Sequence, residues 1–141
     1  MMAQAAIAAL LATLALPTAA AVAPSQGDPA DDACMAAAVS NGDYEDCAQT
    51  WAERTDTALD QVYAEVRSGL ASADCGTQCG ATLALLEAAQ AQWTEWRRKD
   101  CDAIWQLNAD GSIRNIEFLR CMALRANHRA AELRAGYGIT P

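Results

Sequence analysis

Six cysteines constrain this chain more than any other feature, because covalent links between them restrict the folds that it can adopt. They are Cys34, Cys47, Cys75, Cys79, Cys101 and Cys121. An even number of cysteines in a short exported chain is typical of a disulfide framework. A zinc site is not expected, since no two cysteines have C-x-x-C spacing and His128 is the only histidine. Covalent haem would need a C-x-x-C-H motif, so we expect neither a metal nor a cofactor.

The pairing of the cysteines is not fixed by sequence alone, because six of them allow many connectivities. Their positions around turns favour Cys34–Cys47, Cys75–Cys79 and Cys101–Cys121. The first and third pairs flank Gly-containing turns and would each contribute about 3 kcal/mol on a chain-entropy model. Cys75 and Cys79 would instead serve as a redox dithiol if a neighbouring group lowered a thiol pKa, and we see no such group nearby.

The N-terminus has the pattern of an export signal. Residues 5–16 are apolar apart from Thr13, and small residues follow as far as Ala23. This run is too short to span a bilayer, which needs about 20 apolar residues. Ala19-Ala20-Ala21 is the preferred cleavage motif, since cleavage after Ala23 would leave Pro24 first in the mature chain. We predict a signal peptide over 1–21, a flexible leader over 22–33 and a periplasmic or secreted protein without a membrane span.

The charge balance limits the partners of the chain. Its net charge is −8 and its pI is about 4.4. An acidic surface disfavours nucleic acids and anionic membranes as partners. It favours a basic protein partner, or it serves only solubility. About 120 residues remain after cleavage, enough for one domain with one core, and we place that domain over 34–137 with a tail over 138–141.

The apolar residues recur at three- and four-residue steps and predict helices, with no alternation typical of strands. We expect a short helix over 32–39 and long helices over 44–70, 81–107 and 113–135. Gly-containing breaks separate them, with Asp43 and Ser112 as N-caps. The fold class is therefore all-α: a small disulfide-clipped antiparallel helical bundle, with three long helices plus a short N-terminal one.

The helix over 81–107 raises the question of a buried charge. Its expected apolar stripe comprises Leu86, Ala89, Trp93, Trp96, Asp100, Ile104 and Leu107. A buried Asp100 needs a partner, and Arg97 one turn earlier is the nearest candidate for a structural ion pair. The stripes also predict that Trp51, Trp93 and Trp96 pack in the core. Trp105 falls off the stripe and is expected to be exposed.

Three motifs in order resemble the LprI-like lysozyme-inhibitor family of small exported bacterial proteins. The first is Asp56-Thr-Ala-Leu59-Asp60-Gln-Val-Tyr63, with Asp60 where the family usually has Asn. The second is Gln90-Ala-Gln-Trp93-Thr-Glu-Trp96-Arg97 followed by Cys101, with Arg98 where an acidic residue is common. The third is Gly111-Ser112, then Cys121, Arg129 and Glu132-Leu133. Cys75 and Cys79 have no counterpart in these motifs and look like an addition to the family pattern. The resemblance implies a helical fold and, for some members, inhibition of lysozyme.

The function expected from this resemblance is binding rather than catalysis. The exposed turn Asp110-Gly111-Ser112, with Trp105, is the candidate surface for blocking the cleft of a basic lysozyme or a related cell-wall glycan hydrolase. The simpler interpretation is that this turn only joins two helices, as short connections commonly do. A periplasmic binding or structural module with another partner is the alternative function. No catalytic set of Ser, His and Asp, metal ligands or phosphate loop is visible, so we do not expect an enzyme.

Overall fold

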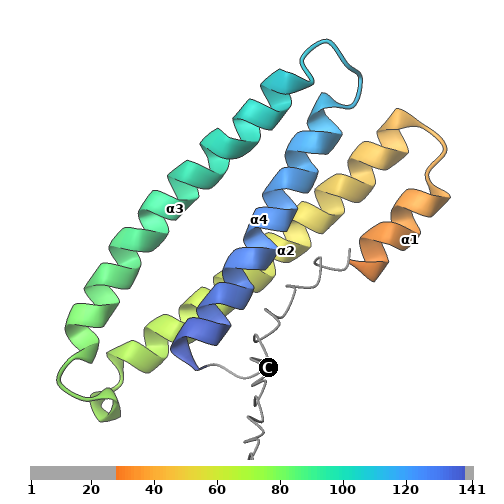
Figure 1. Cartoon of the computed structure of the whole chain (residues 1–141). Coiled ribbons are helices and arrows are strands. Elements are labelled where there is room, and N and C mark those ends of the chain that lie inside the picture. The colour runs from red at the N-terminus through yellow and green to blue at the C-terminus, as the bar shows by residue number, and fades with distance from the viewer. Residues whose placement is uncertain (1–27, 139–141) are drawn as a thin grey trace, which may run out of the picture.

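The protein is a bundle of helices in which consecutive helices run antiparallel (Figure 1). The computed structural model describes residues 28–138, so the predicted signal peptide over 1–21, and residues 22–27 of the leader, lie outside the described residues. The elements are α1 (Pro29–Ala37), α2 (Asn41–Ala71), the 3₁₀ turn η1 (Ala73–Cys75), α3 (Cys79–Leu107) and α4 (Arg114–Tyr137), so that α2 and α4 run in the same direction. No strand occurs between residues 28 and 138. The all-α disulfide-clipped bundle predicted from the sequence is confirmed (Figure 1). None of these helices is both long enough and apolar enough to cross a membrane.

The helix starts differ from the predicted ones because the capping residues differ. Asp28 caps α1, accepting hydrogen bonds from the backbone N–H groups of Ala30 at 2.9 Å and Asp31 at 3.4 Å, so this helix begins inside the predicted flexible leader. The N-cap of α2 is Ser40, and Asp43 completes a capping box by accepting from the Ser40 N–H at 2.9 Å. A hydrogen bond from the Val39 N–H at 3.0 Å, together with those to Ser40, holds the pKa of the Asp43 carboxyl below its usual range. Ser112 does not cap α4, whose N-cap is Ile113 without a side-chain hydrogen bond.

The centre of the bundle is the contact between α2 and α4. The buried residues of α4 are Ile116, Ala123, Ala126, Ala130 and Leu133, which share one face of the helix. Small alanine side chains allow two helix axes to approach closely. Against them α2 packs its own apolar face, which is Cys47, Ala48, Trp51, Ala52, Leu59, Val62 and Val66. The core is therefore formed mainly by α2 and α4, to which α3 adds Leu86.

The stripe predicted for α3 is confirmed at Leu86, which is buried, and at Trp93, which packs partly buried against the core. It was wrong at Trp96 and Leu107, because the helix is rotated relative to the expectation. Its buried residues are Leu86, Gln90, Arg97 and Cys101. Trp96 is 48% exposed and Leu107 is 81% exposed, so neither packs in the core. Cys101 is bonded to Cys121 of α4 and must face that helix. Each residue turns an α-helix by about 100°, so this bond brings Arg97, one turn earlier, inward as well.

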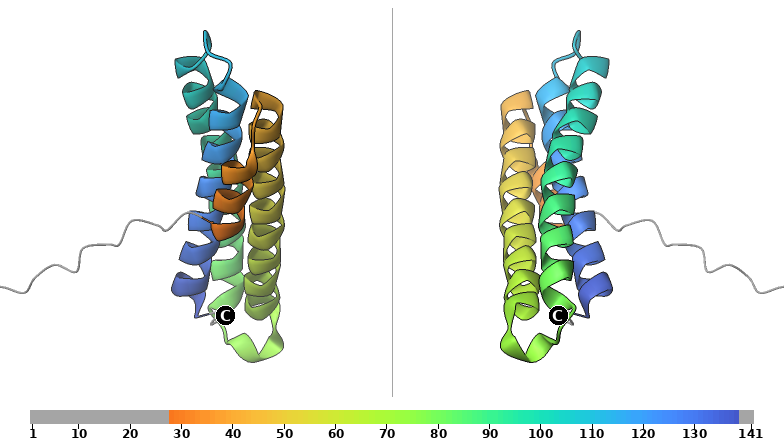
Figure 2. Two further views of the ribbon diagram at one scale, coloured as in Figure 1. Left: turned by 90° about the vertical axis from the view of Figure 1, so that its right-hand side faces the viewer. Right: turned by 90° about the vertical axis from the view of Figure 1, so that its left-hand side faces the viewer.

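The structure contains three disulfides, which are the pairs favoured by the sequence. Cys34–Cys47 joins α1 to α2 with a Cα–Cα distance of 5.7 Å, and Cys101–Cys121 joins α3 to α4 at 5.6 Å. Cys75–Cys79 closes the connection between α2 and α3. Figure 2 shows that α1 lies alongside α2 and α4 on the side away from α3.

Asp31 anchors α1 to the bundle. The residue is 2% exposed, and its Oδ2 accepts a hydrogen bond from Arg120 Nη1 of α4 at 2.9 Å. Burial raises the pKa of the Asp31 carboxyl above its ordinary value of 3.8, an effect that the opposing charge of Arg120 reduces but does not cancel. The folded protein therefore binds this proton more tightly than the unfolded chain does.

The substitution Asp31→Asn is expected to change stability in a pH-dependent way. With the folded pKa raised, the stability that the carboxyl confers is fully present below its unfolded pKa and is lost as the pH rises through its folded pKa. The free energy of unfolding of the wild type, relative to Asp31→Asn, should therefore be higher at pH 3 than at pH 7 in urea titrations. Asp32→Asn removes the same charge from an exposed neighbouring position and is the matched control. A difference that grows towards pH 7 would show that the ion pair with Arg120 outweighs burial.

Candidate functional site

One end of the bundle carries the turn singled out from the sequence, and we call this end the tip. It consists of the α1–α2 connection (38–40), the first turns of α2 and α4, and the α3–α4 turn (108–113). Figure 1 shows both connections at this end, whereas the connection that contains η1 lies at the other end. Four of the eight large apolar side chains that are exposed among the described residues belong to the tip or border it, namely Val39, Tyr44, Leu107 and Ile113. The tip therefore combines apolar surface with the turn singled out from the sequence.

The α3–α4 turn is held by its own backbone. The Asn108 N–H lies 3.3 Å from the Ile104 carbonyl, and the Asn108 amide donates to the same carbonyl at 2.9 Å. The Gly111 N–H donates to the Asn108 carbonyl at 2.9 Å. The Arg114 guanidinium donates to the Ala109 carbonyl at 3.2 Å. These bonds fix the turn from both sides, while the side chains of Asp110 and Ser112 remain exposed.

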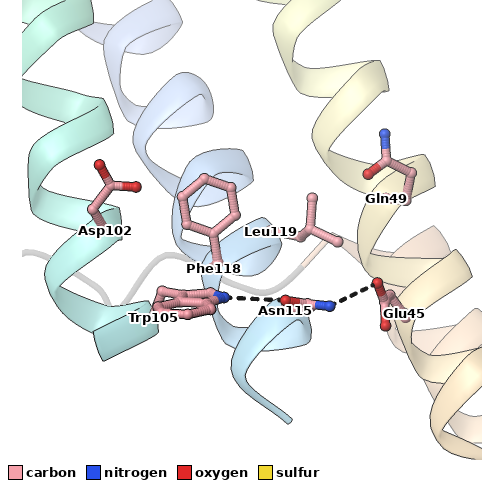
Figure 3. Close-up of a pocket in the computed structure, with 7 residues that line it drawn as sticks. All are labelled: Glu45, Gln49, Asp102, Trp105, Asn115, Phe118 and Leu119. Atoms are coloured by element: carbon pink, nitrogen blue, oxygen red, sulfur yellow. Dashed lines mark hydrogen bonds between the residues drawn. The ribbon is translucent and has the colours of Figure 1, made fainter. Parts of the chain in front are cut away.

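Trp105 lies beside this turn and is half-buried, in contrast to the exposed position expected from the stripe. Its indole Nε1–H donates to Asn115 Oδ1 of α4 at 3.1 Å. Asn115 in turn donates from Nδ2 to Glu45 Oε1 of α2 at 3.2 Å, so one chain of hydrogen bonds links three helices (Figure 3). The Arg114 guanidinium lies over the Trp105 ring at 4.9 Å from its centroid. The indole is thereby fixed in one orientation.

A cavity of about 340 Å³ opens between the three long helices just below the turn. Its lining residues are Glu45, Gln49, Asp102, Trp105, Asn115, Phe118 and Leu119. Figure 3 shows Glu45 and Gln49 on one side, Asp102 and Trp105 on the other, and the three residues of α4 between them. The two carboxylates are the only charged side chains in this lining. The cavity is therefore negatively charged and partly aromatic.

Most of this lining was not singled out from the sequence. Trp105 was expected near the binding surface, but Glu45, Asp102, Asn115 and Phe118 were not. These four residues come from three helices, and their only local signal is a polar or aromatic side chain off the buried stripe near a predicted turn. Which of the off-stripe residues meet depends on how the helices are rotated against one another.

The predicted ion pair between Arg97 and Asp100 is wrong. Arg97 Nη2 contacts Asp56 Oδ1 of α2 at 2.6 Å, and Asp100 Oδ2 accepts instead from Arg125 Nη2 of α4 at 2.8 Å. The rotation of α3 is the physical reason, since it points Arg97 inward between α2 and α4 and leaves Asp100 at the edge that faces Arg125. Both pairs lie along the bundle rather than in the tip.

Metal binding has one geometric candidate among the described residues. Oxygen and sulfur atoms of Asp100, Cys101 and Cys121 lie close together. Zinc and similar metals bind the thiolate form of cysteine, and here both sulfur atoms belong to a disulfide. The arrangement therefore does not provide a ligand set in the oxidised protein. His128 is exposed on α4.

The fold and the tip define the chain as a small, disulfide-linked, all-α protein with a hydrogen-bonded turn exposed at one end. The family model described as "Lysozyme inhibitor LprI" matches residues 34–133, which include all six cysteines and the α3–α4 turn, and the chain belongs to this family. The resemblance inferred from the three motifs is thus confirmed. No curated protein matches the chain, and no solved structure does. The family is one of inhibitors rather than enzymes, and its description implies a protein partner.

Proposed function

We propose that this protein is exported after cleavage of the predicted signal peptide and that it binds and inhibits a lysozyme or a related cell-wall glycan hydrolase through its tip. The observation that carries the proposal is the α3–α4 turn, which is exposed, fixed by hydrogen bonds and adjacent to an oriented tryptophan. Family membership and the three disulfides, which are typical of oxidising compartments, support it.

Inhibition by such a tip has a clear physical basis. Glycan hydrolases act with two carboxylates in a cleft. A turn whose conformation is already fixed loses little conformational entropy when it enters a cleft, so more of the contact energy appears as affinity. Trp105 and the exposed Leu107 supply the kind of aromatic and apolar contact on which interfaces depend. The net charge of −8 attracts a basic hydrolase over long range.

The test is a lysis assay with bacterial cell walls, lysozyme and increasing amounts of the oxidised protein. The wild type should slow lysis in a dose-dependent way. Asp110→Arg reverses a charge on the exposed turn and should raise the half-inhibitory concentration at least about tenfold, equivalent to about 1.4 kcal/mol of binding energy. Asp74→Arg, in the connection at the opposite end, makes the same change in net charge and should leave inhibition within about twofold of the wild type.

The two variants separate a local contact from general electrostatic attraction. Equal losses in Asp110→Arg and Asp74→Arg would show that net charge matters and the tip does not. If the wild type protects cell walls from none of several lysozyme types, the inhibitor function is wrong for this chain. The function would then be that of an envelope binding module with another partner.

A further inference from the structure

We propose that the cavity at the tip accepts a basic side chain of the partner protein, an arginine in particular. The proposal rests on the proposed function in that it names the chemistry by which the tip recognises its partner. The cavity volume, about 340 Å³, is at the lower end of the range of small-molecule sites, about 300–1,000 Å³. It therefore suits one long side chain rather than a folded segment.

The charges around the cavity favour a cation. Glu45 on α2 and Asp102 on α3 face it from opposite walls (Figure 3). Among the described residues, the Glu45 carboxylate bonds only to the neutral amide of Asn115, at 3.2 Å. Asp102 pairs with Arg98 at 2.8 Å, but this pair lies one turn apart on an exposed helix face and is worth at most about 0.5 kcal/mol. Both carboxylates are thus available to a cation from a partner.

The aromatic lining favours a planar cation. Trp105 and Phe118 come from α3 and α4, and a guanidinium stacks well on such rings while its N–H groups reach carboxylate oxygens in its plane. The chain already uses this contact, since Arg120 lies over Trp51 at 5.4 Å and Arg114 lies over Trp105 itself at 4.9 Å. One face of the Trp105 ring is therefore occupied by Arg114, and the partner's guanidinium would stack on Phe118 or on the other face of Trp105. The side-chain oxygen of Gln49 adds an uncharged acceptor to the walls, because Gln49 donates to Glu53 through its Nε2.

An anion is disfavoured at this site, because the lining holds two carboxylates and no lysine or arginine, and the nearby Arg98 and Arg114 already contact Asp102 and the Trp105 ring. A neutral sugar would stack on the rings and bond to the carboxylates, but its binding would remove two charges from water without adding an opposite charge. A basic side chain can both stack on the aromatic rings and pair with the two carboxylates. The net negative charge of the whole chain attracts the same class of basic partner over long range.

The first test uses a small probe and needs no lysozyme. The peptide acetyl-Gly-Arg-Gly-amide is titrated into the oxidised protein, and the NMR signals of the Trp105 indole and the Asn115 side-chain amide are followed. We expect saturable shifts of these signals. The citrulline peptide has the same shape without the charge, and it should bind at least about tenfold more weakly. Equal binding of the two peptides, or shifts confined to other residues, would overturn the proposal.

Variants assign the effect to the two carboxylates. The double variant Glu45→Gln with Asp102→Asn should weaken binding of the arginine peptide at least about tenfold. Glu65→Gln with Asp74→Asn removes two exposed charges outside the cavity and should leave binding within about twofold. Equal affinity of the two double variants would overturn the assignment. Chitotriose, tested in the same way, would identify a glycan site instead if it shifted the Trp105 signal more strongly than the arginine peptide does.

The lysis assay then separates this inference from the proposed function. If wild-type protein protects cell walls and the Glu45→Gln/Asp102→Asn variant protects at least tenfold less well, the cavity takes part in inhibition. If the protein binds the arginine peptide but does not protect cell walls, the proposed role of the cavity holds and the inhibitor function is wrong. Protection that is unchanged in the double variant, with no peptide binding, would reject the cavity and keep the function.

Discussion

Replacing Cys101 and Cys121 together with alanine is expected to lower the free energy of unfolding by about 3 kcal/mol. The bond closes a loop of sequence separation 20, for which the chain-entropy model gives a stabilisation of this size. The loss of stability should be largest in α3, because this helix buries little apolar surface. Two of its four buried residues are Gln90 and Arg97. Cys101 itself is fully buried, so its loss also leaves a small unfilled space.

The measurement is urea denaturation of the purified oxidised variants, with amide hydrogen exchange to locate the change. Exchange should rise most in the C-terminal half of α3 and in the α3–α4 turn. Cys75→Ala with Cys79→Ala is the matched control, because this pair closes a loop of sequence separation 4 and lies largely exposed. Its removal should cost less than about 2 kcal/mol. Equal losses for the two pairs would show that the Cys101–Cys121 bond is not the main link between α3 and α4.

Arg97→Ala is expected to cost about 3 kcal/mol as well, for a different reason. Arg97 is 6% exposed and joins all three long helices. From α3 it contacts Asp56 of α2 at 2.6 Å and donates from Nε and Nη2 to the Met122 carbonyl of α4 at 3.1 and 2.7 Å. Its guanidinium also lies 5.5 Å from the Trp93 ring centroid. Removing a buried partner of such a network, with its packed stem, is strongly destabilising.

The neighbouring residue provides the control for Arg97. Arg98→Ala removes the same side chain from an exposed pair with Asp102 and should cost less than about 0.5 kcal/mol. Arg97→Lys keeps the charge but loses the planar fork, so its cost should lie between those of Arg97→Ala and Arg98→Ala. If Arg97→Ala and Arg98→Ala have the same stability in urea denaturation, the buried network contributes nothing measurable.

The local features of this protein were predictable because they depend on spacing along the chain. The stripes of α2 and α4 follow from apolar residues at three- and four-residue steps, which only a helix places on one face. The disulfide pairs suggested by the turns are those in the structure, since a short helical hairpin brings residues equidistant from its turn together. The exposed turn over 108–113 follows from its glycine and polar residues.

The tertiary structure alone decided how α3 is rotated and what its polar residues meet. Its sequence offers two overlapping faces that share Leu86 and Trp93. One continues through Trp96 and Asp100, and the other through Gln90, Arg97 and Cys101. Helical periodicity favoured the first, and the structure buries the second because Cys101 must face Cys121. The rotation that results pairs Arg97 with Asp56 and brings Asp102 and Trp105 to the cavity beside Glu45. Contacts between residues up to 89 positions apart, such as Asp31 and Arg120, depend on the packing of whole helices, and no local spacing encodes them.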